Sequence, residues 1–391
     1  MPEDRLNTEL AAQLQELATA GLTRHRRVLE TPCGRIATVD SKKVLNFAAN
    51  DYLGLAGNAE IARALADGAV QWGAGSGASH LVSGHLAPHE ALETSIAAFV
   101  GFPHALTFST GYLANLAIVP TLASRGAMIF SDKLNHASLI DAMQLAKANG
   151  AEVQRYPHGD MSALDRQLAA STASNKIIVS DAVFSMDGDL ASLPLLFALA
   201  ERYDAWLVID DAHGFGVLGP HGAGSLAHFN LPAVPRILLM GTLGKAAGVG
   251  GAFVAGSQTA IEYLLQKGRS YIFTTAAPPA IACALSKSLQ IIEQGDALRA
   301  NLFARIGQLR DGLGGLPWRL LPSLTAIQPL IVGENDAAVA LADALWDRGL
   351  WVPAIRPPTV PKGTARLRIS VSAAHTEADI AHLIGALREI A

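Results

Sequence analysis

Apolar residues along the chain follow two different periods. Leu6, Leu10, Leu14 and Leu17 recur at helical spacing, so we expect an amphipathic first helix that ends at Gly21. From about residue 100 to 255, short apolar runs alternate with helix-like segments. This alternation favours an α/β fold with a mostly parallel sheet and helices on both faces. The predicted helices of this part cover residues 111–124, 138–149, 162–170 and 192–204.

Beyond about residue 290 the alternation stops, and longer helices with isolated strands are expected. One predicted helix covers residues 336–348, and the last begins at Thr376, because Thr376 and Asp379 fit a capping box. This part is typical of a smaller α+β unit. The predicted organisation is an N-terminal helix and arm (residues 1–45), a large α/β domain (residues 46–288) and a small C-terminal α+β domain (residues 289–391).

The composition is that of a well-buried globular protein. Half of the 391 residues are hydrophobic, 16% are charged and the net charge is −4. No run of five basic residues occurs, so binding to nucleic acid or to a membrane surface has no electrostatic support. Cys33 and Cys283 are too few for a disulfide framework. Without a signal peptide or a stretch of about 18 apolar residues, we expect a cytoplasmic protein.

Polar residues follow five of the apolar runs, at the point where each predicted strand ends. Parallel sheets bind ligands at the carboxyl ends of their strands. Singly, each residue has an ordinary interpretation, since a histidine is often structural and an aspartate often caps a turn. Their shared place at one edge indicates a site. The groups are Ser109–Tyr112, Asp132 with His136, Ser185 with Asp187 and Asp189, Asp210 with Asp211 and His213, and Thr242 with Lys245.

Lys245 lies among glycines and small apolar residues in "GTLGKAAGVGG". It can be a solvated loop residue, a phosphate-binding lysine or a lysine held for its amine chemistry. A P-loop requires glycine six positions earlier and a hydroxyl residue directly afterwards, but Leu239 and Ala246 occupy these positions. The other glycine-rich stretch, residues 73–84, follows no obvious strand, so a dinucleotide-binding loop is also weakly supported.

His80, His85 and His89 raise the possibility of a metal site. Their spacings of five and four residues do not place them on one helix face, and Pro88 interrupts the segment. We therefore interpret the three histidines as structural and predict no metal.

The amine interpretation of Lys245 accounts for the most residues. A lysine becomes a nucleophile where a poorly solvating pocket lowers its pKa, and its small neighbours leave room for a planar ring. Asp210 can pair with a protonated pyridine nitrogen, and "STGY" offers helix N-terminal N–H groups to a phosphate. These are the groups that pyridoxal 5'-phosphate (PLP) requires. His136 can then lie over the ring, with His213 and Ser185 reaching the ring hydroxyl.

Together these motifs resemble the α-oxoamine synthases, a family of fold-type I PLP-dependent enzymes. The resemblance runs through "NFAANDYLGLA", "STGYLAN", "LNHASL", "VFSMDGD", "DDAHGFGVLG", "GTLGKAAGVGG" and "GTARLRIS". It implies a fold-type I PLP transferase, with a mostly parallel central sheet between two helical layers and a smaller C-terminal domain. Residues 354–370 look most like members that condense L-alanine with a pimeloyl thioester, carried by CoA or an acyl-carrier protein, in biotin biosynthesis.

The resemblance also implies roles for individual residues. Lys245 is the lysine that binds PLP covalently and acts as catalytic base, Asp210 is the partner of the pyridine nitrogen, and His136 stacks on the ring. The other cofactor residues are Ser185 and His213 near the ring hydroxyl, and Gly111, Tyr112 and Thr242 at the phosphate. The substrate residues are Arg24, Asn50, His136 and Thr359, together with Arg368, which binds the amino-acid carboxylate.

Members of this family are homodimers with active sites at the subunit interface. The stretch "FTTAAPP" implies that Thr275 serves the cofactor phosphate of the partner subunit. Two positions depart from the family pattern: Asp181, where relatives often carry Glu, and His85, at a variable position. Neither departure removes a group with an assigned role.

Three other functions remain open from the sequence. The nearest is another α-oxoamine synthase that uses glycine, such as glycine C-acetyltransferase or 5-aminolevulinate synthase. An ATPase that uses "GTLGK" predicts magnesium-dependent phosphate release and a colourless protein. A non-catalytic PLP-binding module predicts a coloured protein that converts no amino acid.

Overall fold

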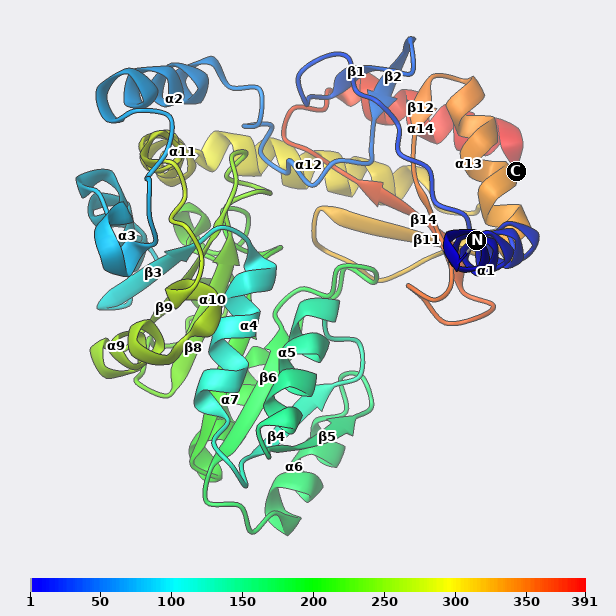
Figure 1. The fold of residues 1–391 in the computed structure, drawn as a ribbon. Helices are drawn as coiled ribbons and strands as arrows, with labels where there is room; N and C mark the ends of the chain where they lie inside the picture. The colour runs from blue at the N-terminus through cyan, green and yellow to red at the C-terminus, as the bar shows by residue number, and fades with distance from the viewer. Residues whose placement is uncertain (1) are drawn as a thin grey trace.

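The computed structural model describes residues 2–391 and has a seven-stranded sheet at its centre (Figure 1). The strand order is β3-β9-β8-β7-β6-β4-β5, in which β9 is antiparallel to both neighbours and the other pairs are parallel. The predicted mostly parallel sheet is confirmed. The strands are β3 (His104–Phe108), β4 (Met128–Asp132), β5 (Glu152–Tyr156), β6 (Lys176–Asp181), β7 (Ala205–Asp210), β8 (Ile237–Thr242) and β9 (Ala252–Gly256).

The predicted helices alternate with these strands and cover the sheet on both faces. In β7, Leu207 joins one buried cluster with Leu196 of α7, whereas its neighbour Val208 joins a second cluster with Ile118 of α4. Successive side chains of a strand point to opposite faces, so a central strand covered on both sides is apolar throughout. The helices around the sheet are α3 (Ala87–Phe99), α4 (Gly111–Leu122), α5 (Ala137–Ala148), α6 (Met161–Ala170), α7 (Leu193–Arg202), α8 (Ser225–His228), α9 (Gln258–Lys267) and α10 (Arg269–Ile272), with the 3-10 turn η2 (Pro220–Gly222).

Two smaller sheets involve the C-terminal part of the chain. One is a four-stranded antiparallel sheet in the order β10-β11-β14-β13, made of β10 (Arg319–Leu320), β11 (Ile327–Gly333), β13 (Ala354–Ile355) and β14 (Ala365–Ser370). Its helices are α12 (Asp296–Gly312), α13 (Asn335–Asp347) and α14 (Glu377–Ile390). The predicted capping box of α14 is confirmed: Thr376 Oγ1 accepts a hydrogen bond from Asp379 N–H, and the Asp379 carboxylate accepts one from Thr376 N–H.

The second small sheet joins the two ends of the chain. β1 (Ile36–Val39) pairs with β2 (Lys42–Asn46), and β2 pairs in parallel with β12 (Leu350–Trp351). An ion pair of 2.9 Å between Arg35 and Asp379 holds the same two parts together. Figure 1 accordingly shows the N-terminal segment on the side of the C-terminal helices. The domain boundaries after residues 45 and 288 stay a prediction.

The remaining helices are α1 (Pro2–Thr19), α2 (Ala59–Trp72), the π-helical turn η1 (His80–Gly84) and α11 (Pro279–Glu293). The predicted first helix is present, but Leu6 and Leu14 on its apolar face are each 65% exposed. α2 and α11 pack against each other through Gly68, where an added Cβ would lie 2.9 Å from Cys283 Cβ. Over residues 2–391, no helix combines the length and the apolar character needed to cross a membrane.

Candidate active site

A cavity of about 180 Å³ lies at the carboxyl ends of the parallel strands. Five separate strand-to-helix or strand-to-loop connections reach it, as the arrangement of parallel strands requires. Eight of the predicted site residues line this one cavity: Gly111, Tyr112, His136, Ser185, Asp210, His213, Thr242 and Lys245. Ser138, Asp181, Ala212 and Met240 complete the wall.

One side of the cavity is the N-terminus of α4. Thr110 caps the helix, because its hydroxyl accepts a hydrogen bond of 3.2 Å from Leu113 N–H. Gly111 and Tyr112 are the first two residues of the helix and line the cavity. The first N–H groups of a helix have no intrahelical partner and carry a partial positive charge, so this side of the cavity can bind an anion such as a phosphate.

Lys245 lies on the loop that follows β8 and is partly buried. Its Nζ lies 2.8 Å from Nε2 of His213. Burial lowers the pKa of Lys245 to about 8, although the negative charge of Asp210 acts in the opposite direction. In a large fraction of the protein molecules, the Lys245 amine is therefore neutral and nucleophilic near pH 8.

The lowered pKa predicts a distinct pH dependence for the chemical labelling of Lys245. In the cofactor-free protein, labelling by a neutral amine reagent should be about tenfold slower at pH 7 than at pH 9, because the neutral fraction rises through a pKa of about 8. Peptide mass spectrometry of timed samples measures this rate, and the exposed Lys133 in the same digest provides the comparison. Equal pH profiles for the two lysines would contradict the prediction.

Hydrogen bonds connect Lys245 to residues far away in the sequence. His213 Nδ1 lies 2.7 Å from the Tyr52 hydroxyl, which donates a hydrogen bond of 3.1 Å to Oδ1 of Asn50. Burial, followed by the charges of Lys245 and Arg368, lowers the pKa of His213 well below its usual value. A neutral His213 can accept a hydrogen bond from Lys245 at Nε2 and donate one to the Tyr52 hydroxyl at Nδ1.

Asp210 is buried at the end of β7 and is held by two donors. Its Oδ2 accepts a hydrogen bond of 2.8 Å from Nδ2 of Asn115, and its Oδ1 accepts one of 3.0 Å from Ala212 N–H. Asn115 in turn donates to the Ser138 hydroxyl at 2.9 Å. The two donors fix the carboxylate and stabilise its negative charge, so the cavity contains an anionic group opposite the N-terminus of α4.

Asp181 and His136 form a neighbouring pair on the cavity wall. The Asp181 carboxylate accepts a hydrogen bond of 2.9 Å from His136 N–H. Burial and the neighbouring charge of Asp210 raise the pKa of Asp181 well above its usual value. Burial also lowers the pKa of His136, so its ring is neutral and apolar enough to lie against another ring.

Arg368 is buried beside these residues without a carboxylate partner among residues 2–391. It donates hydrogen bonds of 2.7 Å to the Ser185 carbonyl and 3.1 Å to Oδ1 of Asn50. Arg366, two residues earlier on β14, has its own ion pair with Asp187 at 2.8 Å. A buried guanidinium that contacts only neutral oxygens is suited to binding a carboxylate from a substrate.

Comparison with known proteins assigns the family. The chain matches the family described as aminotransferase class I and II over residues 42–387. The chain belongs to the class I and II aminotransferase family. A curated relative in this family, the 8-amino-7-oxononanoate synthase of Dechloromonas aromatica, is 83% identical over 391 residues, which is 100% of both chains.

Solved structures agree with this family assignment. A serine palmitoyltransferase from S. paucimobilis with bound PLP superposes with a TM-score of 0.91 at 30% identity, covering 97% of this chain and 96% of that one. An 8-amino-7-oxononanoate synthase from Francisella tularensis gives a TM-score of 0.77 at 31% identity, over 89% of this chain and 98% of that one. The resemblance to α-oxoamine synthases and the fold-type I architecture are confirmed.

Five predicted residues of this aminotransferase-family chain do not line the cavity of Lys245. Two of them, Asn50 and Arg368, are connected to it through hydrogen bonds with the Tyr52 hydroxyl. Arg24 and Thr359 line a larger cavity of about 720 Å³, whose other walls include Leu14, Leu17 and Arg356. Thr275 lies in a third cavity of about 350 Å³, next to Ser109 and Gly251. The predicted cofactor and substrate residues therefore lie at three cavities of the chain.

Sequence reasoning did not single out Tyr52, Asn115 and Ser138, although they contact the predicted residues directly. All three lie in motifs quoted above: Tyr52 in "NFAANDYLGLA", Asn115 in "STGYLAN" and Ser138 in "LNHASL". None of these motifs shows which residue of another segment a side chain contacts.

Proposed function

We propose that this chain is a PLP-dependent 8-amino-7-oxononanoate synthase. It joins the α-carbon of L-alanine to the acyl carbon of a pimeloyl thioester and releases CO2 and the free thiol carrier. The observation that carries the proposal is the identity of 83% with a curated synthase over 100% of both chains. The Lys245 cavity supports it independently through the chemistry of its residues.

The donor set of this cavity fits PLP. Lys245 offers an amine with a pKa of about 8, and Asp210 offers a buried carboxylate fixed by two hydrogen bonds. Gly111 and Tyr112 at the N-terminus of α4, with Thr242, would hold the phosphate. An aldehyde, a pyridine nitrogen and a phosphate require these three kinds of group.

We assign the chemical steps on this chain to a small number of side chains. When bound, PLP withdraws electrons from the α-carbon of the amino acid. Lys245 Nζ removes the α-proton of alanine and later returns a proton to the product. His213, 2.8 Å from that nitrogen, orients the amine and remains neutral. With PLP bound, Asp210 would keep a positive charge on the pyridine nitrogen, and His136 would lie against the ring.

Arg368 is assigned to the carboxylate of alanine. Its guanidinium is buried and reaches Asn50, while Ser185 and Tyr52 fix its orientation. A positioned guanidinium can bind a carboxylate through two hydrogen bonds, which fixes the direction of the α-proton. Asn50 connects this residue to the Lys245 network through Tyr52.

We assign the acyl chain to the cavity that Arg24 and Thr359 share. It combines apolar walls from Leu14 and Leu17 with a cation, as an aliphatic chain with a terminal carboxylate requires. Arg368 N–H donates a hydrogen bond of 3.0 Å to the carbonyl of Pro353, directly before this wall begins. β13, whose residues Ala354 and Ile355 line the acyl cavity, pairs with β14, which carries Arg368.

Substitution of Arg24 by alanine should raise KM for pimeloyl-CoA by about ten- to a hundredfold, because a charge-assisted contact to the acyl carboxylate is lost. KM for L-alanine should stay within about twofold. Steady-state kinetics with each substrate varied in turn measures both values. Arg26→Ala, at an exposed arginine two residues further along the chain, is the matched control. Equal changes in both KM values would show that Arg24 has no specific role in acyl binding.

The function itself is tested by product formation. The PLP-loaded protein should form 8-amino-7-oxononanoate from L-alanine with pimeloyl-CoA or a pimeloyl-loaded acyl-carrier protein, detected by mass spectrometry. Glycine with acetyl-CoA or succinyl-CoA should give little product. Faster turnover of glycine with acetyl-CoA or succinyl-CoA than of L-alanine with a pimeloyl thioester would overturn the proposal. It would favour another α-oxoamine synthase activity. A comparison of the two pimeloyl donors identifies the carrier.

We also propose that the active enzyme is a cytoplasmic homodimer in which Thr275 serves the partner's cofactor phosphate. One observation supports a role outside the active site of its own chain: Thr275 does not line the Lys245 cavity. Sedimentation velocity tests the dimer. Mixed dimers of Thr275→Ala and Lys245→Ala chains test the exchange of residues between subunits.

A further inference from the structure

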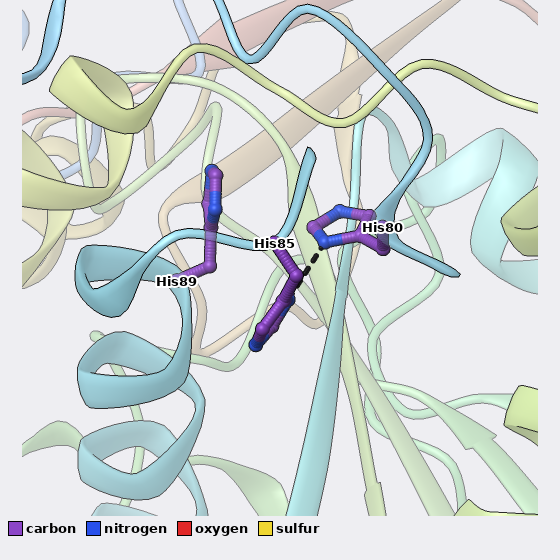
Figure 2. Close-up of side chains that lie close together, drawn as sticks. All are labelled: His80, His85 and His89. Carbon is purple, nitrogen blue, oxygen red and sulfur yellow. Dashed lines mark hydrogen bonds between the residues drawn. The ribbon is translucent and has the colours of Figure 1, made fainter. Parts of the chain in front are cut away.

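Three histidines outside the active-site cavity lie close together at the start of α3. His80 begins η1, His85 directly follows it, and His89 is in the first turn of α3 (Figure 2). A ligand nitrogen from each ring lies within 4.8 Å of the others. The three histidines do not lie on one regular helix, as their spacing predicts, but their rings converge because the π-helical turn and the bend before α3 change the direction of the chain.

The two rings of His80 and His85 face each other through their Nδ1 atoms, which are 2.8 Å apart (Figure 2). Two Nδ1 atoms at this distance share one proton, so one ring donates and the other accepts. Burial, followed by the neighbouring imidazoles, lowers the pKa of His80 to about 4. Two imidazole nitrogens that face each other at this distance are suited to binding a transition metal ion.

Glu90 supplies the second contact that metal-binding histidines usually have. Its Oε2 lies 3.1 Å from Nε2 of His85, on the side of the ring away from His80. A carboxylate in this place fixes the proton on Nε2 and leaves Nδ1 as the ligand atom. His85 is 26% exposed and Glu90 is 72% exposed at the side chain, so an ion can enter from solvent.

We propose that His80 and His85, with His89 as a third ligand, form a binding site for a divalent transition metal ion such as Zn²⁺. The ion replaces the proton between the two Nδ1 atoms, and that proton moves to Nε2 of His80. Zinc–nitrogen bonds of about 2.0–2.1 Å in tetrahedral geometry require the two nitrogens to lie about 3.3 Å apart. The present 2.8 Å must therefore widen only slightly.

His89 is the ligand that has to change its contacts. Its Nδ1 accepts a hydrogen bond of 3.0 Å from Leu86 N–H, and its Nε2 donates one of 2.8 Å to the Ala277 carbonyl. One of these bonds must break before His89 can bind the ion. Imidazole ligands with a nearby carboxylate suit Zn²⁺, Ni²⁺ and Cu²⁺ rather than Ca²⁺ or Mg²⁺.

The test is calorimetric titration of the chelator-treated, PLP-loaded protein with Zn²⁺. The wild type should bind one ion per chain at this site, and His85→Asn and Glu90→Gln should each weaken binding by at least about tenfold. His104→Asn, at an exposed histidine of β3, is the control and should bind like the wild type. The Co²⁺-loaded wild type should show visible absorption that His85→Asn lacks.

Thermal unfolding gives a second readout that does not depend on activity. Zn²⁺ should raise the unfolding temperature of the wild type and of His104→Asn more than that of Glu90→Gln, because an ion that binds only the folded chain stabilises it. Glu90 is exposed, so its substitution leaves the fold intact even if changes at His80 disturb the stacking on Tyr271. Absence of saturable Zn²⁺ binding, or equal binding by the wild type, His85→Asn and Glu90→Gln, would overturn the proposal.

Discussion

Substitution of Lys245 by alanine is expected to lower the turnover of L-alanine and pimeloyl-CoA by more than about 1,000-fold. The variant loses both the covalent attachment of PLP and the base that moves the α-proton. The loss should appear in kcat, because Arg368 and the acyl cavity are unchanged and still bind the substrates. Product formation under saturating substrates measures it.

Two further measurements separate this role from a general loss of structure. Lys267→Ala, at an exposed lysine of α9, should keep wild-type turnover. In the wild type, borohydride reduction followed by tryptic digestion should leave a pyridoxyl group on the peptide that spans residues 237–267. Normal turnover by Lys245→Ala, or an adduct on a different peptide, would refute the assignment.

Substitution of Asp210 by asparagine is expected to lower kcat by about 100- to 1,000-fold while PLP still binds. The asparagine keeps the size of the side chain but removes the negative charge that faces the cavity. Asp211→Asn should retain most of the turnover, because the Asp211 carboxylate points away from the cavity and accepts hydrogen bonds from Ser225 N–H and the Ser225 hydroxyl.

The effect of Asp211→Asn should instead appear in stability. Asp211 is 1% exposed, and the loss of a buried acceptor typically costs about 1–3 kcal/mol. Steady-state kinetics should therefore show the larger loss of kcat for Asp210→Asn. Thermal unfolding should show the larger loss of stability for Asp211→Asn. Equal losses of kcat would mean that Asp210 is not the carboxylate that supports the cofactor.

Helices and strands could be predicted from the sequence, because the spacing of apolar residues that indicates them repeats within a few neighbouring positions. The helix expected over residues 192–204 is Leu193–Arg202, and the helix expected over 336–348 is Asn335–Asp347. Residues at the ends of parallel strands could also be grouped, because parallel strands deliver their carboxyl ends to one edge. That rule placed Lys245, Asp210 and His136 at one cavity.

The remaining contacts could not be predicted, because they join segments that no local pattern connects. The contact between Tyr52 and His213 spans 161 positions of the sequence. The convergence of His80 and His85 depends on a π-helical turn, which adds about one residue to each turn and changes the facing positions. A period of 3.6 residues, which sequence analysis assumes, places these side chains on different faces.

The pairing of β2 with β12 has a consequence for synthesis on the ribosome. Residue 46 leaves the ribosome 305 residues before residue 351, its partner in the register. At translation rates of roughly 5–20 residues per second, this delay is about 15–60 s. During that time Val44 lacks the cover of Trp346 and Trp351, so the apolar face of the nascent β1–β2 hairpin stays exposed to solvent or to a chaperone.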